Sequence, residues 1–243
     1  MKYKFHYISL TPLKRMVLLL FFLCGFAVAF SQNYKDDIIK MNEKYQNVSF
    51  KMNIEMQVYH WNNTEANIVE KGIVKKQQDN YHSEFGDKIT FKNKKYNILV
   101  LKNEKIITYL ELANYSNDAN VSQNQMDILT SFKTDTTNLN KYIKLISSTK
   151  ETKTYEIPLG QNGIEKMHLK ISANYVMQQV TYFYEKIEND NPIKKVIITY
   201  SNVVFNPKFL VNEFSEKQFF TIKGGKAVVS EHYKEYTIKK QLY

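Results

Sequence analysis

The sequence predicts a mainly β protein with helices, of the α+β class. Three observations predict it. Aromatic residues form 14% of the chain, with 18 Tyr and 15 Phe against one Trp, and flat rings suit a pleated sheet. Apolar and polar residues alternate strictly from Phe50 to Val58, as in a strand with one buried face. Many shorter segments of this kind follow, separated by polar turns, which indicates an antiparallel meander.

The overall composition is that of a globular protein. Of 243 residues, 43% are hydrophobic and 24% are charged, which excludes disordered and collagen-like chains. Seven Gly and four Pro are too few for a long flexible linker. We therefore expect one domain of about 200 residues, covering 32–243 after an N-terminal targeting segment.

Residues 1–31 have the features of a secretory signal peptide. Basic residues precede an uninterrupted apolar run from Met16 to Phe30, which ends in small residues. Ala29 and Ser31 lie three and one positions before a cut ahead of Gln32. The run is shorter than the roughly 20 residues of a spanning helix. We therefore expect an exported, periplasmic protein.

Cys24, the only cysteine, leaves a second interpretation of this segment open. A bacterial lipoprotein signal ends at such a cysteine, but it requires a small residue where this chain has Leu23. We therefore favour cleavage after Ser31 over an outer-membrane lipoprotein anchored through Cys24. The mature chain then has no disulfide, so core packing and strand pairing must supply its stability.

The charge of the mature chain comes from lysine alone. Without 1–31 it keeps 30 Lys and no Arg against 24 acidic residues, a net charge of +6. Arginine supplies the bidentate contacts to bases and phosphates, so we expect no nucleic-acid partner. The lysines are interpreted as a solvated surface, with transient attraction to an anionic membrane surface as the alternative.

The first mature segment, 33–46, predicts an amphipathic helix. Its apolar face is formed by Tyr34, Ile38, Met41 and Tyr45. The strand after it has an apolar face formed by Phe50, Met52, Ile54, Met56 and Val58. Further strands are predicted at 68–75, 81–85, 88–92, 96–102 and 106–111.

The second half of the chain is predicted to begin with an exposed loop at 114–125. A short helix carrying Met126, Leu129 and Phe132 follows at helical spacing. Residues 142–148 fit a helix or a strand equally well. The remaining strands are predicted at 153–158, 166–172, 176–186, 194–201, 213–222 and 226–231, with a last edge strand within 232–243.

Motifs of catalysis and metal binding are missing from the sequence. The four mature histidines are scattered, without the close spacing of zinc ligands, and no nucleophile elbow or phosphate-binding loop occurs. We therefore expect no enzyme, no cofactor and no metal. The alternative left open is a pair of carboxylates brought together from distant strands.

Four stretches of the chain resemble lipoprotein carriers and receptors of the LolA/LolB type. They are a strand pair at 72–85, a hairpin at 97–110, a strand at 177–182, and a closing pattern at 197–205 followed by Phe214. The resemblance covers 33 to about 221, and the residues beyond form a C-terminal extension. The arginine that the carriers use near the lid has no counterpart in the mature chain.

This resemblance implies an incomplete, strongly curved antiparallel β-barrel with a helical lid over an apolar cavity. It implies a monomeric periplasmic carrier for lipoprotein acyl chains or another amphiphile, acting in outer-membrane lipoprotein sorting, with lipidated proteins or lipid as partners. The residues expected to line the cavity are Phe50, Met52, Ile54, Met56, Val58, Ile98, Val100, Met126, Leu129 and Phe132.

Two alternatives to this interpretation stay open. The apolar stripes could form ordinary core. The protein could also be a non-enzymatic envelope sensor or scaffold that uses the same half-barrel to bind a protein partner. An open strand edge or the extension at 224–243 would then bind by strand addition.

Overall fold

The structure is a computed structural model that describes residues 34–46, 48–112, 143–186 and 192–241. The expected signal peptide, the loop 114–125 and the helix with Met126, Leu129 and Phe132 lie outside these ranges. One α-helix is described, α2 (Tyr34–Tyr45). The strands are β1 (Phe50–His60), β2 (Ile68–Gln77), β3 (Asn80–Phe85), β4 (Lys88–Lys92), β5 (Tyr96–Leu101), β6 (Ile106–Glu111), β7 (Lys144–Ser148), β8 (Thr152–Gln161), β9 (Ile164–Ser172), β10 (Met177–Tyr184), β11 (Ile193–Phe205), β12 (Phe220–Lys223), β13 (Lys226–Val229) and β14 (Thr237–Lys240).

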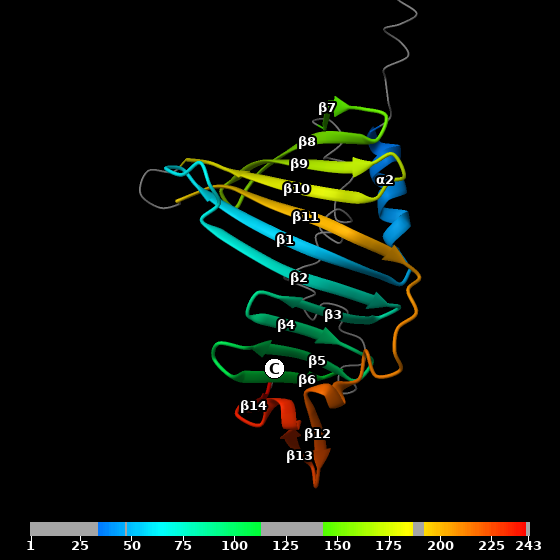
Figure 1. The fold of residues 1–243 in the computed structure, drawn as a ribbon, viewed down its shortest axis with the longest axis vertical. Helices are drawn as coiled ribbons and strands as arrows, with labels where there is room; N and C mark the ends of the chain where they lie inside the picture. The colour runs from blue at the N-terminus through cyan, green and yellow to red at the C-terminus, as the bar shows by residue number, and fades with distance from the viewer. Residues whose placement is uncertain (1–33, 47, 113–142, 187–191, 242–243) are drawn as a thin grey trace, which may run out of the picture.

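Twelve of the strands form one open sheet (Figure 1) in the order β14-β6-β5-β4-β3-β2-β1-β11-β10-β9-β8-β7. Two meanders, β1–β6 and β7–β11, meet where β1 pairs with β11. All neighbours are antiparallel except β14, which pairs in parallel with β6. The predicted mainly β class is confirmed, but the sheet is mixed and does not close into a barrel. The lid and the cavity remain predictions.

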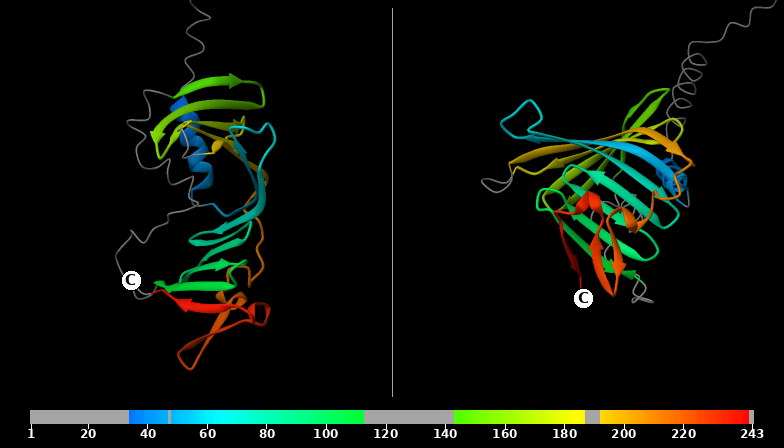
Figure 2. Two further views of the ribbon diagram at one scale, coloured as in Figure 1. Left: turned by 90° about the vertical axis from the view of Figure 1, so that its left-hand side faces the viewer. Right: turned by 60° about the horizontal axis from the view of Figure 1, so that its bottom comes forward.

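The sheet bends around α2, which lies on its concave face (Figure 2). We call the opposite face convex. Register assigns the strand residues to the two faces, since directly paired residues point the same way. Met52 pairs with Val74, and Val74 pairs with Ser83. Ser83 pairs with Thr90, which pairs with Leu99. Leu99 therefore shares the concave face with Met52.

A hydrophobic cluster fills the space between α2 and the concave face. The helix contributes Ile38, Met41 and Tyr45, at the spacing that the sequence predicts. The sheet contributes Phe50, Met52, Val74, Tyr155, Ile157, Met167, Leu169, Ile171, Met177, Val180 and Tyr200. Most of these sheet residues come from β8–β11, so α2 is packed chiefly on the second meander.

The C-terminal segment covers the convex face of β4–β6. Ile89, Phe91, Ile98, Val100, Ile107 and Tyr109 of the sheet pack there with Phe219, Phe220 and Tyr233 of the segment. The predicted edge strand is confirmed as β14, which extends the sheet beyond β6. The extension therefore adds a strand to its own sheet and buries a second core behind it.

Most predicted strands match the structure to within a few residues, and the ambiguous 142–148 segment contains β7. The predicted strand at 213–222 is wrong. This stretch contains a 3-10 helix (Glu216–Gln218), capped by Ser215, whose hydroxyl accepts a hydrogen bond from the Lys217 N–H. The strand β12 begins after this helix, at Phe220. The adjacent residues Phe219 and Phe220 are both buried, which regular alternation along a strand does not allow.

Candidate functional site

The concave face is the candidate site, because α2 covers only one end of its apolar surface. Phe50 and Met52 are buried in the cluster under the helix. Ile54 is partly buried and packs against the edge of that cluster. Met56 is partly buried and Val58 is buried, and neither belongs to the cluster. The predicted row of five β1 side chains thus shares one face, and it extends beyond the helix.

The row continues across the neighbouring strand β11. Ile54 pairs with Tyr200, Met56 with Ile198, and Val58 with Val196. Ile198 is partly buried, as Met56 is. Apolar side chains on adjacent strands therefore form a strip next to the helix-covered core.

Ile98 and Val100 do not belong to this site. Each occupies the convex face, buried at 1% and 0% exposure in the second core under the C-terminal segment. The sequence pattern could not separate the two faces here, because Leu99 and Leu101 between and beyond them are apolar as well. Only the register through β3 and β4 makes the assignment.

Asp37 fixes α2 to the sheet by polar contacts at the edge of the core. Its side chain is 9% exposed, and its Oδ2 lies 2.7 Å from Lys153 Nζ. The Tyr155 hydroxyl donates a hydrogen bond to the same oxygen. Burial, with the neighbouring Asp37 carboxylate, raises the pKa of Tyr155, so the phenol keeps its proton and remains a donor. Lys44 of the helix donates to the Asn174 carbonyl at 2.8 Å.

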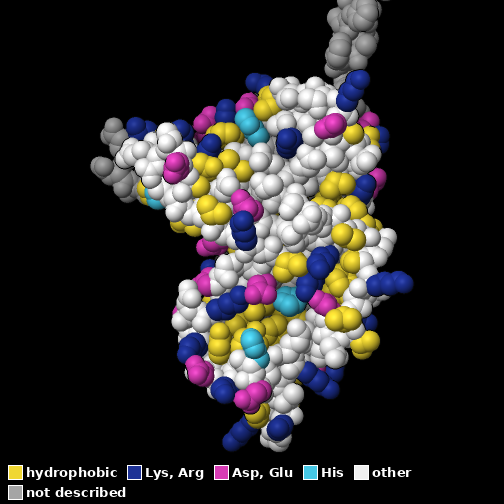
Figure 3. Space-filling model, in the orientation of Figure 1, with side chains coloured by type: hydrophobic (Ala, Val, Ile, Leu, Met, Phe, Trp, Pro, Cys, Tyr) yellow, Lys and Arg dark blue, Asp and Glu magenta, His cyan; other side chains and the backbone are white. Residues whose placement is uncertain are grey.

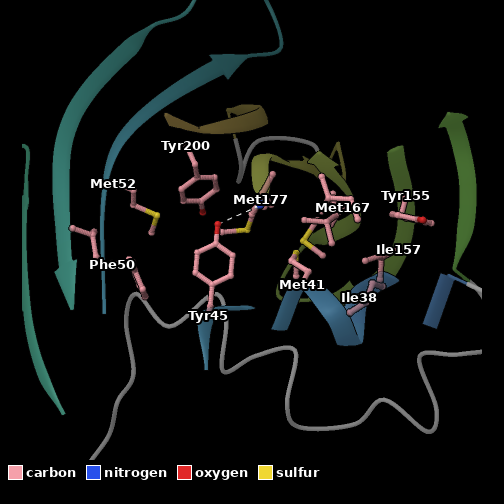
Figure 4. Close-up of a cluster of buried hydrophobic side chains, with 14 residues drawn as sticks. Ile38, Met41, Tyr45, Phe50, Met52, Tyr155, Ile157, Met167, Met177 and Tyr200 are labelled. Atoms are coloured by element: carbon pink, nitrogen blue, oxygen red, sulfur yellow. Dashed lines mark hydrogen bonds between the residues drawn. The ribbon is translucent and has the colours of Figure 1, made fainter. Parts of the chain in front are cut away.

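Two tyrosine hydroxyls point into the cluster (Figure 4). The Tyr45 oxygen accepts the Met177 backbone N–H at 3.3 Å, and burial raises the pKa of Tyr45 to about 12. Tyr200 is 5% exposed. Its hydroxyl has no hydrogen-bond partner among the described residues, and burial raises its pKa. A buried hydroxyl without a partner costs about 1–3 kcal/mol.

Methionine is common in the side chains around these hydroxyls. Met41, Met52, Met167 and Met177 point into the space between α2 and the sheet (Figure 4). Methionine is flexible and fits irregular apolar surfaces. Met41 and Met52 lie on apolar faces that the sequence predicts, whereas Met167 and Met177 were not among the predicted site residues, although the alternation of Met167, Leu169 and Ile171 indicates an apolar face for Met167.

The described residues lack two further features that would bear on the site. They contain no group of three or more His, Cys, Asp or Glu side chains placed to hold a metal ion. Within those same ranges, no helix has the length and hydrophobicity needed to cross a membrane.

No protein-family model matches the chain, and no curated protein does either. Among solved structures, an uncharacterized conserved protein from Thermus thermophilus matches with a TM-score of 0.47 and 7% identity, over 86% of this chain and 100% of that chain. A LolA superfamily protein from Nitrosomonas europaea matches at 0.36 and 10%, over 76% and 98%. The Pseudomonas aeruginosa MucA/MucB complex matches at 0.39 and 9%, over 82% and 64%. The matches thus include the superfamily that the sequence resembles, at TM-scores too low to decide fold or function.

Proposed function

We propose that the protein is an exported, periplasmic binding protein for an acyl chain or another amphiphile, held on the concave face of the sheet. A carrier of lipoprotein acyl chains is the specific form of this proposal. The role requires binding and release, with no catalytic step. The buried Asp37 carboxylate is already engaged by Lys153 and Tyr155, so it acts as a brace for α2.

The observation that carries the proposal is the partly exposed apolar strip beside α2. Ile54 and Met56 lie on the same face as buried Phe50 and Met52, yet both keep contact with solvent. Ile198 on β11 extends this strip next to Met56. Each methylene that a ligand buries there contributes about 0.8 kcal/mol, so a long acyl chain could bind by area alone.

The Tyr200 hydroxyl favours an amphiphile over a pure hydrocarbon. Tyr200 is directly opposite Ile54 in the β1–β11 pairing, so its ring stands beside the strip. Its hydroxyl lacks a partner among the described residues. Because this hydroxyl is buried in the cluster under α2, an ester or carboxyl oxygen of a ligand reaches it only if the helix shifts, and that contact would remove the cost of an unpaired buried donor.

Two substitutions test the proposal, Ile54→Phe and Met56→Phe. In a site that is open for ligand, the empty protein tolerates the added ring, and retention of a fluorescent fatty acid falls. In a filled core, each ring costs roughly 1–3 kcal/mol of unfolding free energy. Gln57→Phe is the matched control, because Gln57 alternates with these residues on the convex face. Lost stability with unchanged probe retention in the two variants would contradict the proposal.

A second candidate function, binding of a protein partner, is favoured by one strand edge. Among the described strands, β7 ends the sheet and pairs only with β8. All five of its residues are exposed, including Leu145 at 37% and Ile146 at 45%. An extended segment of a partner could pair with this edge. The extension, in contrast, already uses β14 to pair with β6. If the mature protein retains no fluorescent fatty acid, ligand binding is excluded and the binding of a protein partner becomes the favoured function.

A further inference from the structure

The connection between β11 and β12 exposes two adjacent aliphatic side chains. Leu210 is 77% exposed and Val211 is 101% exposed. The next most exposed large hydrophobic side chain in the described ranges is Val69, at 51%. Over this connection, Figure 3 shows hydrophobic side chains next to lysines. Two large aliphatic side chains exposed side by side on one turn are available for contact with another apolar surface.

The turn that carries this pair is held firmly. The Glu213 N–H donates to the Leu210 carbonyl at 3.0 Å. The Gln218 side-chain amide donates to the carbonyls of Asn212, Glu213 and Ser215 at 2.8, 3.0 and 3.2 Å. Glu213 also forms an ion pair with Lys75 of β2, in which both side chains are only 18% exposed. The exposure of the aliphatic pair is therefore a feature of a braced turn.

The uncompensated charge around the turn is positive. Lys208 and Lys217 are exposed. Glu213 is neutralised by Lys75, whereas Glu216, which accepts a hydrogen bond from the neutral amide of Asn93 at 3.0 Å, keeps its charge, so the two lysines outnumber it by one. An approaching surface would thus meet two aliphatic side chains flanked by ammonium groups.

We propose that the Leu210–Val211 turn inserts shallowly into the interfacial layer of an anionic membrane, with Lys208 at the level of the lipid headgroups. A protruding aliphatic tip suits a deformable lipid layer, and anionic headgroups complement the lysines. This contact would bring the protein to a membrane surface reversibly. It does not require that the concave face holds a ligand.

Vesicle sedimentation of the mature protein tests the contact. We expect binding to phosphatidylglycerol/phosphatidylethanolamine vesicles and little binding to phosphatidylcholine vesicles. The double variant Leu210→Ser/Val211→Ser should bind roughly tenfold more weakly, and Lys208→Gln roughly fivefold more weakly. The matched control is Ile222→Ser/Val228→Ser, which removes aliphatic side chains of 43% and 41% exposure from the β12–β13 hairpin and should bind as wild type does.

Two results would overturn this inference. One is wild-type protein that fails to sediment with the anionic vesicles, which would exclude the membrane contact and leave a protein partner as the other occupant to test. The other is equal sedimentation of wild type and the Leu210→Ser/Val211→Ser variant. Fatty-acid probe retention, measured on the same samples, should be unchanged by these substitutions. Failure of the membrane contact and failure of the proposed ligand binding are therefore distinguishable.

Discussion

Replacing Asp37 by Ala should loosen the attachment of α2 to the sheet. The substitution leaves the Lys153 ammonium and the Tyr155 hydroxyl without their shared acceptor. Removing one partner of a buried ion pair costs about 3–5 kcal/mol. Because Lys153 is 22% exposed and water can solvate it in part, we expect a loss of about 2–4 kcal/mol in unfolding free energy.

Urea unfolding followed by circular dichroism measures this loss. Asp36→Ala is the matched control, since Asp36 is the exposed neighbour on the same helix turn, and it should change the unfolding free energy by less than about 0.5 kcal/mol. Asp37→Asn keeps an acceptor for Tyr155 and should fall between the two. An Asp37→Ala variant as stable as the Asp36→Ala control would refute the view that this contact fixes α2.

Three further predictions concern the rest of the sheet. Burial, and to a smaller extent the positive charge of Lys75, lowers the pKa of His82. The neutral His82 side chain therefore contributes fully to stability above about pH 6.5. This contribution is lost as the pH falls below that value, because the unfolded chain then binds the proton first. His82→Gln should flatten unfolding free energy against pH there, and an unchanged slope would contradict this. Gly72→Ala should cost about 1–3 kcal/mol in urea unfolding, because its Cβ would lie 2.7 Å from Phe85 Cδ2. Phe220→Ala, at 0% exposure, should cost about 3–5 kcal/mol, against under about 0.5 kcal/mol for exposed Ile222→Ala; equal losses would exclude a core under the extension.

The sequence patterns located the strands but only part of their pairing. Alternation along β1 identified a face correctly, because polar residues mark the other side. In β5 apolar residues occupy both faces, and one parity packs under the C-terminal segment. The local sequence pattern therefore assigned Ile98 and Val100 to the concave face, although both lie on the convex face.

The remaining differences come from tertiary contacts that no local pattern contains. The parallel pairing of β14 with β6 joins segments far apart in the chain, such as Ile238 with Ile107. The expected strand at 213–222 is largely a turn in the structure, because the rings of the adjacent residues Phe219 and Phe220 both pack in the second core. The position of Tyr200 beside Ile54 depends on the register between β1 and β11, which the sequence does not specify.

The most direct test of the central claim is to map where a bound acyl chain lies. The mature protein would be irradiated with a photoreactive fatty acid, and the labelled peptides would be identified by mass spectrometry. Our account predicts label on β1 and β11 around Ile54, Met56 and Ile198, with labelling reduced in Met56→Phe. Label confined to the convex face, or no label that unlabelled fatty acid can displace, would contradict it.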